Sequence, residues 1–298
     1  MDPAVGDPLG VRAACAWVTE RARQVHLGPL EATLDAVFDV PVPDWDTDHH
    51  YAGPPERVLR YLLVLDTINF SFWTPPGWGG PRRGYREVAA ALRRVFDAGD
   101  DLGTAEALRS VTAPRLERLL GGPLPMLEAR AAALRELGRH GFEGLVQPTA
   151  AATAGTLAER LESYRDVPVY RGRPIPILKR AQIAAADLQA AGVRAFPDLA
   201  ALTCFADYKL PQILRHRGAL VLGPDLARRI DTLTPLTAGE PAEVELRCAT
   251  VTCVERLRDE LVARGRALTA VQVDWILWDA SQALKGMAPY PRTRTVFY

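Results

Sequence analysis

The chain has no net charge and no long apolar run, and each of these two absences argues against a class of function. Its 36 basic residues balance 36 acidic residues, so the formal net charge is zero. A protein built mainly to hold a nucleic-acid backbone normally carries a basic excess, which is missing here. No segment approaches the length of a membrane span, and the first residues show no signal-peptide pattern. We therefore expect a cytoplasmic protein with no membrane partner.

The cysteines and histidines also lack the spacing of a metal site. None of the four cysteines belongs to a C-x-x-C pair, and no histidine cluster lies near them, which argues against zinc. A polar loop over residues 41–55 sets acids beside His49 and His50, but loops this polar are usually just solvated. We expect neither a metal nor a cofactor.

What the chain has in abundance is helical spacing. Hydrophobic residues make up 48% and charged residues 24% of its 298 positions, an ordinary globular balance. Apolar stripes bounded by Gly or Pro predict helices over residues 11–25, 29–40, 56–72, 85–96, 104–120, 124–137, 149–164, 178–191, 242–263 and 269–284. Residues 165–176 look extended and are the best candidate boundary. The sequence predicts an all-α fold, a single compact multi-helix domain over residues 1–298 with room for a short β-hairpin.

One stretch concentrates chemistry: FADYKLPQILRH, residues 205–216, places an acid, a phenol, a base, an amide and an imidazole within ten residues. Pro211 suits the first turn of a helix, where its missing N–H costs nothing. Asp207 lies just before that turn, where a carboxylate accepts backbone N–H groups and meets the positive end of the helix dipole. Spacing alone favours a simple helix cap, because capping acids greatly outnumber catalytic ones.

Other strings occur with it in a definite order: NFSFW (residues 69–73), KRAQI (179–183), VDWILWD (273–279) and RTRTVFY (292–298). Together they resemble the queuosine salvage protein family, over most of the chain. Members of that family are queuosine 5'-phosphate N-glycosylases, and they resemble helical DNA glycosylases in architecture. The resemblance implies that this chain hydrolyses the N-glycosidic bond of queuosine 5'-phosphate and releases queuine for salvage into tRNA.

The resemblance also implies roles for two residues. Breaking an N-glycosidic bond builds positive charge on the ribose, so a carboxylate must face the anomeric carbon. Asp207 is the candidate, either as a base that activates water or as a direct nucleophile. Queuine is a 7-deazaguanine and lacks the N7 that purine glycosidases usually protonate, so electrostatic stabilisation matters more. Lys179 stands at the family's functional lysine position and would tune Asp207 or handle a proton; otherwise it is a surface lysine.

The remaining candidates would hold the base, the sugar or the phosphate. Aromatic side chains can stack on a flat base, amides and acids can read its edge, and cations can bind the 5'-phosphate. The substrate-binding set expected is Asn69, Phe70, Ser71, Phe72, Trp73, Gln182, Tyr208, Lys209, His216, Glu245, Trp275, Asp279, Arg292 and Arg294. The structural alternatives are core aromatics, capping amides and solvated surface charges.

The sequence departs from the family pattern in two places. Ile177-Leu178 stands where an aromatic pair usually precedes the Lys-Arg-Ala-Gln string, and Lys209 stands where arginine is more usual. Lys209 keeps the charge but loses the bidentate fork.

Two other functions stay open. A base-excision glycosylase would need a basic face and a wedge to flip a base, and no stable nucleic-acid complex is expected here. A non-catalytic module for a modified base or tRNA would use Asp207 only as a cap.

Overall fold

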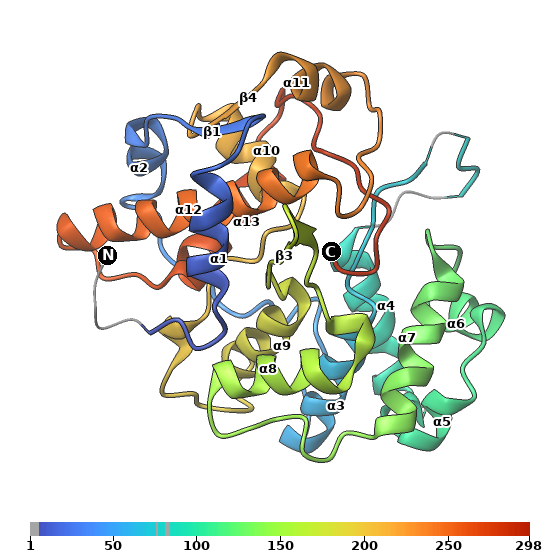
Figure 1. Cartoon of the computed structure of the whole chain (residues 1–298). Helices are drawn as coiled ribbons and strands as arrows, with labels where there is room; N and C mark the ends of the chain where they lie inside the picture. The colour runs from blue at the N-terminus through green and yellow to red at the C-terminus, as the bar shows by residue number, and fades with distance from the viewer. Residues whose placement is uncertain (1–5, 76, 81–83, 100) are drawn as a thin grey trace. The chain divides into compact units, whose positions relative to one another are not determined.

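The computed structural model describes residues 6–75, 77–80, 84–99 and 101–298, and its regular structure is mostly helical (Figure 1). The described residues form thirteen α-helices, so the expected all-α class is confirmed. In chain order they are α1 (Val11–Thr19), α2 (Glu31–Val37), α3 (Pro55–Thr67), α4 (Tyr85–Asp97), α5 (Ala105–Arg109), α6 (Ala113–Leu119), α7 (Leu127–His140), α8 (Ala150–Arg160), α9 (Lys179–Ala190), α10 (Lys209–His216), α11 (Pro224–Asp231), α12 (Pro241–Ala263) and α13 (Ala270–Ala283). None of these helices is long and apolar enough to cross a membrane.

The chain divides into two compact units, each assembled from segments that are far apart in the sequence. The first unit comprises Met1–Pro43, Asp166–Gln182 and Asp198–Arg294, and the second comprises Asp44–Arg165, Ile183–Pro197 and Thr295–Tyr298. One division falls between Arg165 and Asp166, within the segment from which the sequence predicts a boundary.

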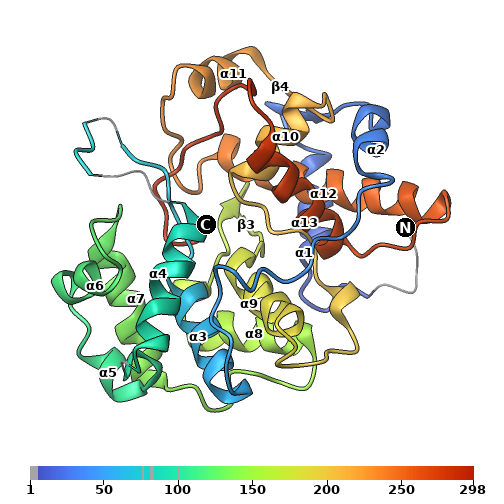
Figure 2. The same ribbon diagram turned by 180° about the vertical axis from the view of Figure 1, so that it is seen from behind.

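Helix α12 is the centre of the first unit. Its buried residues lie on every face, which is typical of a core helix. Helices α1, α10 and α13 pack against it, as Figures 1 and 2 show. Pro241 starts α12 in the first turn, where a missing N–H costs nothing.

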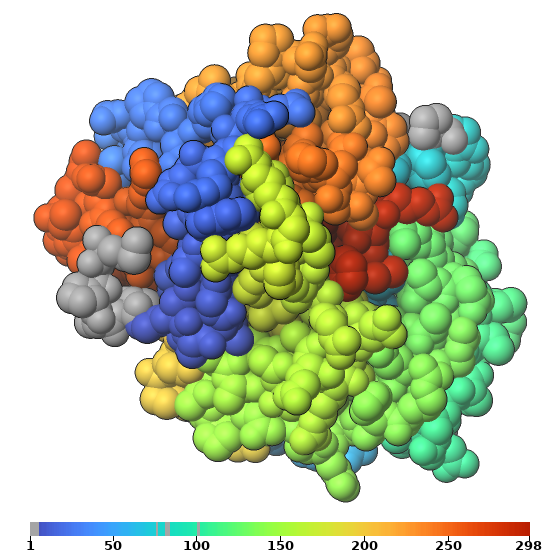
Figure 3. Space-filling model, viewed as in Figure 1, coloured from blue at the N-terminus to red at the C-terminus, as the bar shows by residue number. Residues whose placement is uncertain are grey.

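Two small antiparallel sheets complete this unit. Strands β2 (Val169–Tyr170) and β3 (Arg173–Pro174) form the short hairpin that the sequence predicts. On the face seen in Figure 3, this yellow-green hairpin lies beside the blue helix α1, and the Tyr170 ring meets the edge of Trp17 at 6.2 Å between centroids. Strands β1 (Val25–Leu27) and β4 (Leu220–Leu222) also pair. The β1–β4 pair corrects the expected helix over residues 11–25, which ends at Thr19.

The second unit is built on α3, with α4 and α7 packed against it. The helix expected over residues 104–120 is two helices, because Thr112 caps a new start by accepting the Arg115 N–H at 3.3 Å. The helix expected over residues 56–72 ends at Thr67, and Ser71 beyond it has a left-handed φ of 42°. Short 3-10 helices occur at Asp101–Gly103, Glu162–Tyr164 and, in the first unit, Leu199–Ala201.

Candidate active site

Asp207 caps helix α10 with one half of its carboxylate. Its Oδ1 accepts the backbone N–H of Lys209 at 2.6 Å and of Leu210 at 3.0 Å. These donors belong to the first turn of α10, where backbone N–H groups have no partner within the helix. No described residue donates a hydrogen bond to the other oxygen, Oδ2. The residue as a whole is partly exposed, and the cap uses only one of its two carboxylate oxygens.

Burial and two lysines act on the Asp207 carboxyl in opposite directions. Desolvation raises its pKa, while the positive charge of Lys179, the two backbone N–H bonds and the charge of Lys209 lower it in part. Desolvation in turn lowers the pKa of Lys209, and Asp207 opposes that shift. Lys179 is buried at the start of α9, with 5% of its surface exposed. Asp207 and Lys179, which lie 28 positions apart in the sequence, therefore share one electrostatic environment.

Asp274 on α13 interacts electrostatically with Asp207 and is absent from the site that the sequence predicts. Its Oδ2 accepts the backbone N–H of Phe205 at 2.7 Å, two residues before Asp207. Burial raises the pKa of Asp274 well above its usual range, and the charge of Asp207 raises it further. The sequence favours Asp279 on this helix, yet Asp279 is exposed and Asp274 is buried. The signal was available: Asp274 stands at helical spacing from Val271 and Leu277, on the apolar stripe.

A cluster of rings and cations lies beside the start of α10. The rings of Tyr208 and Tyr290 are 4.9 Å apart between centroids. Lys209 Nζ lies 5.3 Å and Arg292 Cζ 5.7 Å from the centre of the Tyr290 ring. Three of the expected site residues therefore lie together: Tyr208, Lys209 and Arg292. Tyr290, which the sequence does not predict, lies among them. Tyr290 was missed because the extended tail has no periodicity that would assign its side chain to a face.

Other expected residues lie elsewhere in the first unit. His216 is exposed at the opposite end of α10, about 10 Å along the axis from its first residue at 1.5 Å per residue. Arg294 is exposed, and Trp275 is partly exposed on α13.

Two expected substrate contacts are used to hold the scaffold. Gln182 is fully buried, and its Nε2 donates to Ile177 O at 2.9 Å and to Thr203 Oγ1 at 3.0 Å, while its Oε1 accepts the Thr203 N–H at 2.8 Å. Glu245 Oε2 accepts the N–H groups of Arg23 and Gln24, and its Oε1 accepts the Tyr170 hydroxyl. We therefore leave Gln182 and Glu245 out of the substrate-binding set.

The string from Asn69 to Trp73 belongs to the second unit. Phe70 is 1% exposed, and the guanidinium of Arg130 covers its ring at 4.4 Å from the centroid. Ser71 ties the string to the chain end, donating its N–H to Tyr298 O and its hydroxyl to Thr295 O, each at 2.8 Å. Asn69 Nδ2 lies 3.5 Å from Asp66 Oδ1. Phe72 is partly exposed and Trp73 is buried, so Phe72 is the ring of this string best placed to meet a ligand.

The arrangement around Asp207 suits a reaction that develops positive charge. A carboxylate with one oxygen that no described residue uses can stabilise a cation, and the positive charges of Lys179 and Lys209 favour its ionised form against the effect of burial. Across the described residues, no group of three or more His, Cys, Asp or Glu side chains is arranged to hold a metal ion.

Comparison with known proteins agrees with this chemistry. The family model described as queuosine salvage protein matches residues 49–298. The chain belongs to the queuosine salvage protein family. A relative from Sphaerobacter thermophilus, named queuosine 5'-phosphate N-glycosylase/hydrolase, is 39% identical over 98% of this chain and 99% of its own length. Relatives of the same name from Mus musculus and Dictyostelium discoideum are 31% and 32% identical, over 99% and 86% of this chain and 100% and 83% of their own lengths.

Proposed function

We propose that this protein hydrolyses the N-glycosidic bond of queuosine 5'-phosphate and releases queuine. The observation that carries the proposal is the divided use of the Asp207 carboxylate, in which Oδ1 caps α10 and Oδ2 has no described donor. The same activity is in the names of family members that match nearly the whole chain. The proposal therefore rests on the hydrogen bonding of Asp207 and, independently, on the names of these relatives.

Asp207 acts on the sugar. As the bond between the anomeric carbon and the base breaks, positive charge grows on the ribose, and an ionised carboxylate beside it lowers the energy of that state. The base leaves with the electron pair of the broken bond. Water then adds its oxygen to the anomeric carbon, either directly or by displacing Asp207 from a covalent bond to the sugar. Asp207 takes the proton that water loses, and the departed nitrogen of the base gains a proton, so that the products are queuine and ribose 5-phosphate. Both routes need Asp207 ionised, and Lys179 and Lys209 favour that form.

The cations beside the Tyr208–Tyr290 pair are our candidates for the 5'-phosphate. Lys209 and Arg292 share the Tyr290 ring and lie near the start of α10, whose positive dipole end also favours an anion. Trp275 is our candidate in the first unit for stacking on the base, and Phe72 and Trp73 of the second unit stay predictions for that role. The other predicted substrate contacts stay predictions: Asn69, Asp279, His216 and Arg294. Phe70 and Ser71 hold the string of residues 69–73 in place within the second unit.

The test is a release assay without added metal. Purified protein is incubated with queuosine 5'-phosphate, queuosine, guanosine 5'-phosphate and a tRNA that carries queuosine, and free base is measured by chromatography. We expect queuine from queuosine 5'-phosphate and no base from guanosine 5'-phosphate or from the tRNA. Binding of queuosine 5'-phosphate without any release would instead make the protein a binding module and Asp207 only a helix cap.

A further inference from the structure

A buried ion pair links the backbone segments that carry Lys179 and Asp207. Arg247 on α12 donates to both oxygens of Asp166, at 2.9 Å to Oδ1 and 2.5 Å to Oδ2. The two side chains are 3% and 2% exposed. Taking two charges out of water costs free energy that offsets much of their attraction. A net gain in stability therefore does not by itself explain why this pair is buried. Its backbone contacts indicate what else it does.

One end of the pair holds the residue before Asp207. Arg247 Nε donates to the carbonyl oxygen of Ala206 at 3.1 Å. On either side of that contact, Phe205 donates its N–H to Asp274, and Asp207 donates its own N–H to Phe205 O at 2.6 Å. The backbone that leads into α10 is therefore fixed at consecutive residues.

The other end holds the residues that lead into Lys179. Asp166 Oδ2 accepts the Lys179 N–H at 3.1 Å, and the Asp166 carbonyl oxygen accepts the N–H groups of Ile177 and Leu178 at 3.0 and 3.2 Å. Leu178 has a left-handed φ of 54°, a conformation that a leucine adopts only when its surroundings impose it. Asp166 thus determines where α9 begins and from where the Lys179 side chain extends.

No direct contact fixes the separation of the two reactive groups. Lys179 and Asp207 influence each other's charge, but no hydrogen bond or ion pair joins these two side chains. Their spacing therefore depends on the backbone segments that carry them, and Asp166 and Arg247 join those segments.

We propose that Asp166 and Arg247 are positioning residues that set the distance between Lys179 and Asp207. The proposal rests on the proposed function, because it assigns these residues to the glycosidic reaction. It uses the geometry of arginine, whose planar fork binds Asp166 with two nitrogens while its Nε binds Ala206. Lysine in its place keeps the charge but presents a single ammonium, which cannot hold both partners in that geometry.

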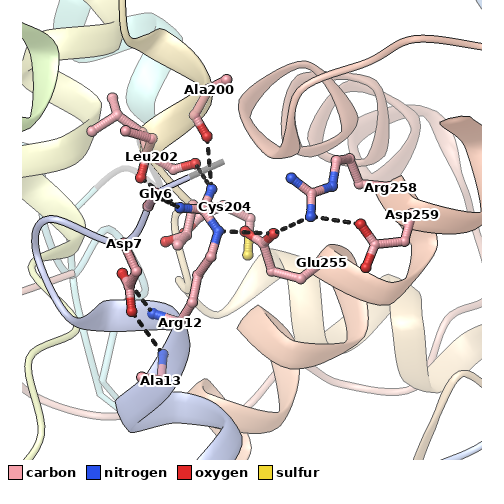
Figure 4. Close-up of polar contacts among 12 residues, drawn as sticks. Gly6, Asp7, Arg12, Ala13, Ala200, Leu202, Cys204, Glu255, Arg258 and Asp259 are labelled. Atoms are coloured by element: carbon pink, nitrogen blue, oxygen red, sulfur yellow. Dashed lines mark hydrogen bonds and ion pairs between the residues drawn. The ribbon is translucent and has the colours of Figure 1, made fainter. Parts of the chain in front are cut away.

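The test is Arg247→Lys, with Arg258→Lys as the matched control on the same helix. Arg258 is also buried and also pairs with carboxylates, at 3.1 Å to Glu255 and 2.6 Å to Asp259, but neither partner lies in the segments around Lys179 or Asp207 (Figure 4). We expect Arg247→Lys to lower kcat about 10- to 100-fold, the effect of roughly an ångström of misplacement, with KM within about threefold. Arg258→Lys should leave both within about twofold.

A second measurement does not depend on activity. The charged groups that act on Asp207 are Lys179 on α9, Lys209 on α10 and Asp274 on α13. If Lys179 moves away, the pKa of Asp207 rises, and the acid limb of the kcat profile moves to higher pH. Carbon-13 NMR titration of the Asp207 carboxyl should show the same rise in Arg247→Lys and none in Arg258→Lys.

The outcomes separate the two proposals. An unchanged kcat and an unchanged Asp207 titration in Arg247→Lys would overturn the positioning role, as would equal losses in both variants. If the wild-type protein releases no queuine, the proposed function fails. The NMR titration then still decides whether Asp166 and Arg247 set the spacing of Lys179 and Asp207.

Discussion

Asp207 and Glu255 are two acids of the first unit that both lose contact with water on folding but have different partners. Burial raises the pKa of both carboxyls. Glu255 lies between two arginines, at 3.0 Å from Arg12 Nε and 3.1 Å from Arg258 Nη2 (Figure 4). Asp207 receives two backbone N–H groups on one oxygen and forms no ion pair with any described residue. The charge of Glu255 is balanced inside the protein, whereas that of Asp207 can balance a developing cation.

The arginines around Glu255 explain what its charge is used for. Arg12 also donates to the carbonyl oxygens of Ala200, Ala201 and Leu202, at 2.8, 2.7 and 2.7 Å. Glu255 and Arg12 therefore join α12 and α1 to the segment around the 3-10 helix at Leu199–Ala201 (Figure 4). This is a structural use of an acid, and it predicts that the two acids respond to substitution in opposite ways.

The largest effect should be on catalysis. Asp207→Asn should lower kcat for queuine release at least about 100-fold, because it removes the only ionised oxygen that the mechanism uses. Glu255→Gln should stay within about threefold of wild type, because Glu255 contacts none of the residues that we assign to the substrate. Initial rates at saturating queuosine 5'-phosphate measure both. A folded Glu255→Gln protein as inactive as Asp207→Asn would contradict the comparison.

Stability should show the reverse order. Glu255→Gln leaves Arg12 and Arg258 in a buried site without their shared carboxylate, and breaking a buried pair in this way costs about 3 kcal/mol of unfolding free energy. Asp207→Asn keeps an oxygen that can accept the N–H groups of Lys209 and Leu210 and removes a desolvated charge. We expect it to be no less stable than wild type at neutral pH. Urea unfolding followed by circular dichroism measures both values, and a clear loss in Asp207→Asn would make its capping role dominant.

The stability difference between Asp207→Asn and wild type should also depend on pH. The folded pKa of Asp207 is raised, so its contribution to stability is fully present below the unfolded value of about 3.9 and is lost as pH rises through the folded pKa. The asparagine variant does not titrate there. Its stability relative to wild type should therefore grow from acidic to neutral pH, as measured by urea midpoints across that range. A constant difference would mean that desolvation of Asp207 is offset by Lys179, Lys209 and its hydrogen bonds.

Local features of this molecule were predictable from the sequence, and long-range ones were not. Helices such as α4 and α12 follow from spacing within a few turns, and the short hairpin follows from composition. Strands β1 and β4 are three residues each and lie almost two hundred positions apart, so neither carries a signal of its own. Whether the Gln182 amide is available to a substrate also depends on a distant partner. Its amide is used by Thr203, 21 positions away, and no local pattern reveals that.

The smallest effect should come from Asp274, which tests the rule that an acid without an arginine is a reactive acid. Asp274 also forms no ion pair with a described residue, yet it is 3% exposed and its pKa is raised well above the usual range, so its protonated form is favoured. Asn resembles that neutral form and keeps an oxygen for the Phe205 N–H. Asp274→Asn should therefore keep kcat within about threefold of wild type. Asp274→Ala leaves the Phe205 N–H without an acceptor, which should lower the free energy of unfolding by about 1–3 kcal/mol. A loss in Asp274→Asn as large as that in Asp207→Asn would mean that the reaction needs both charges. In our proposal, partial exposure and the charges of Lys179 and Lys209, rather than the missing arginine alone, distinguish Asp207 from Asp274.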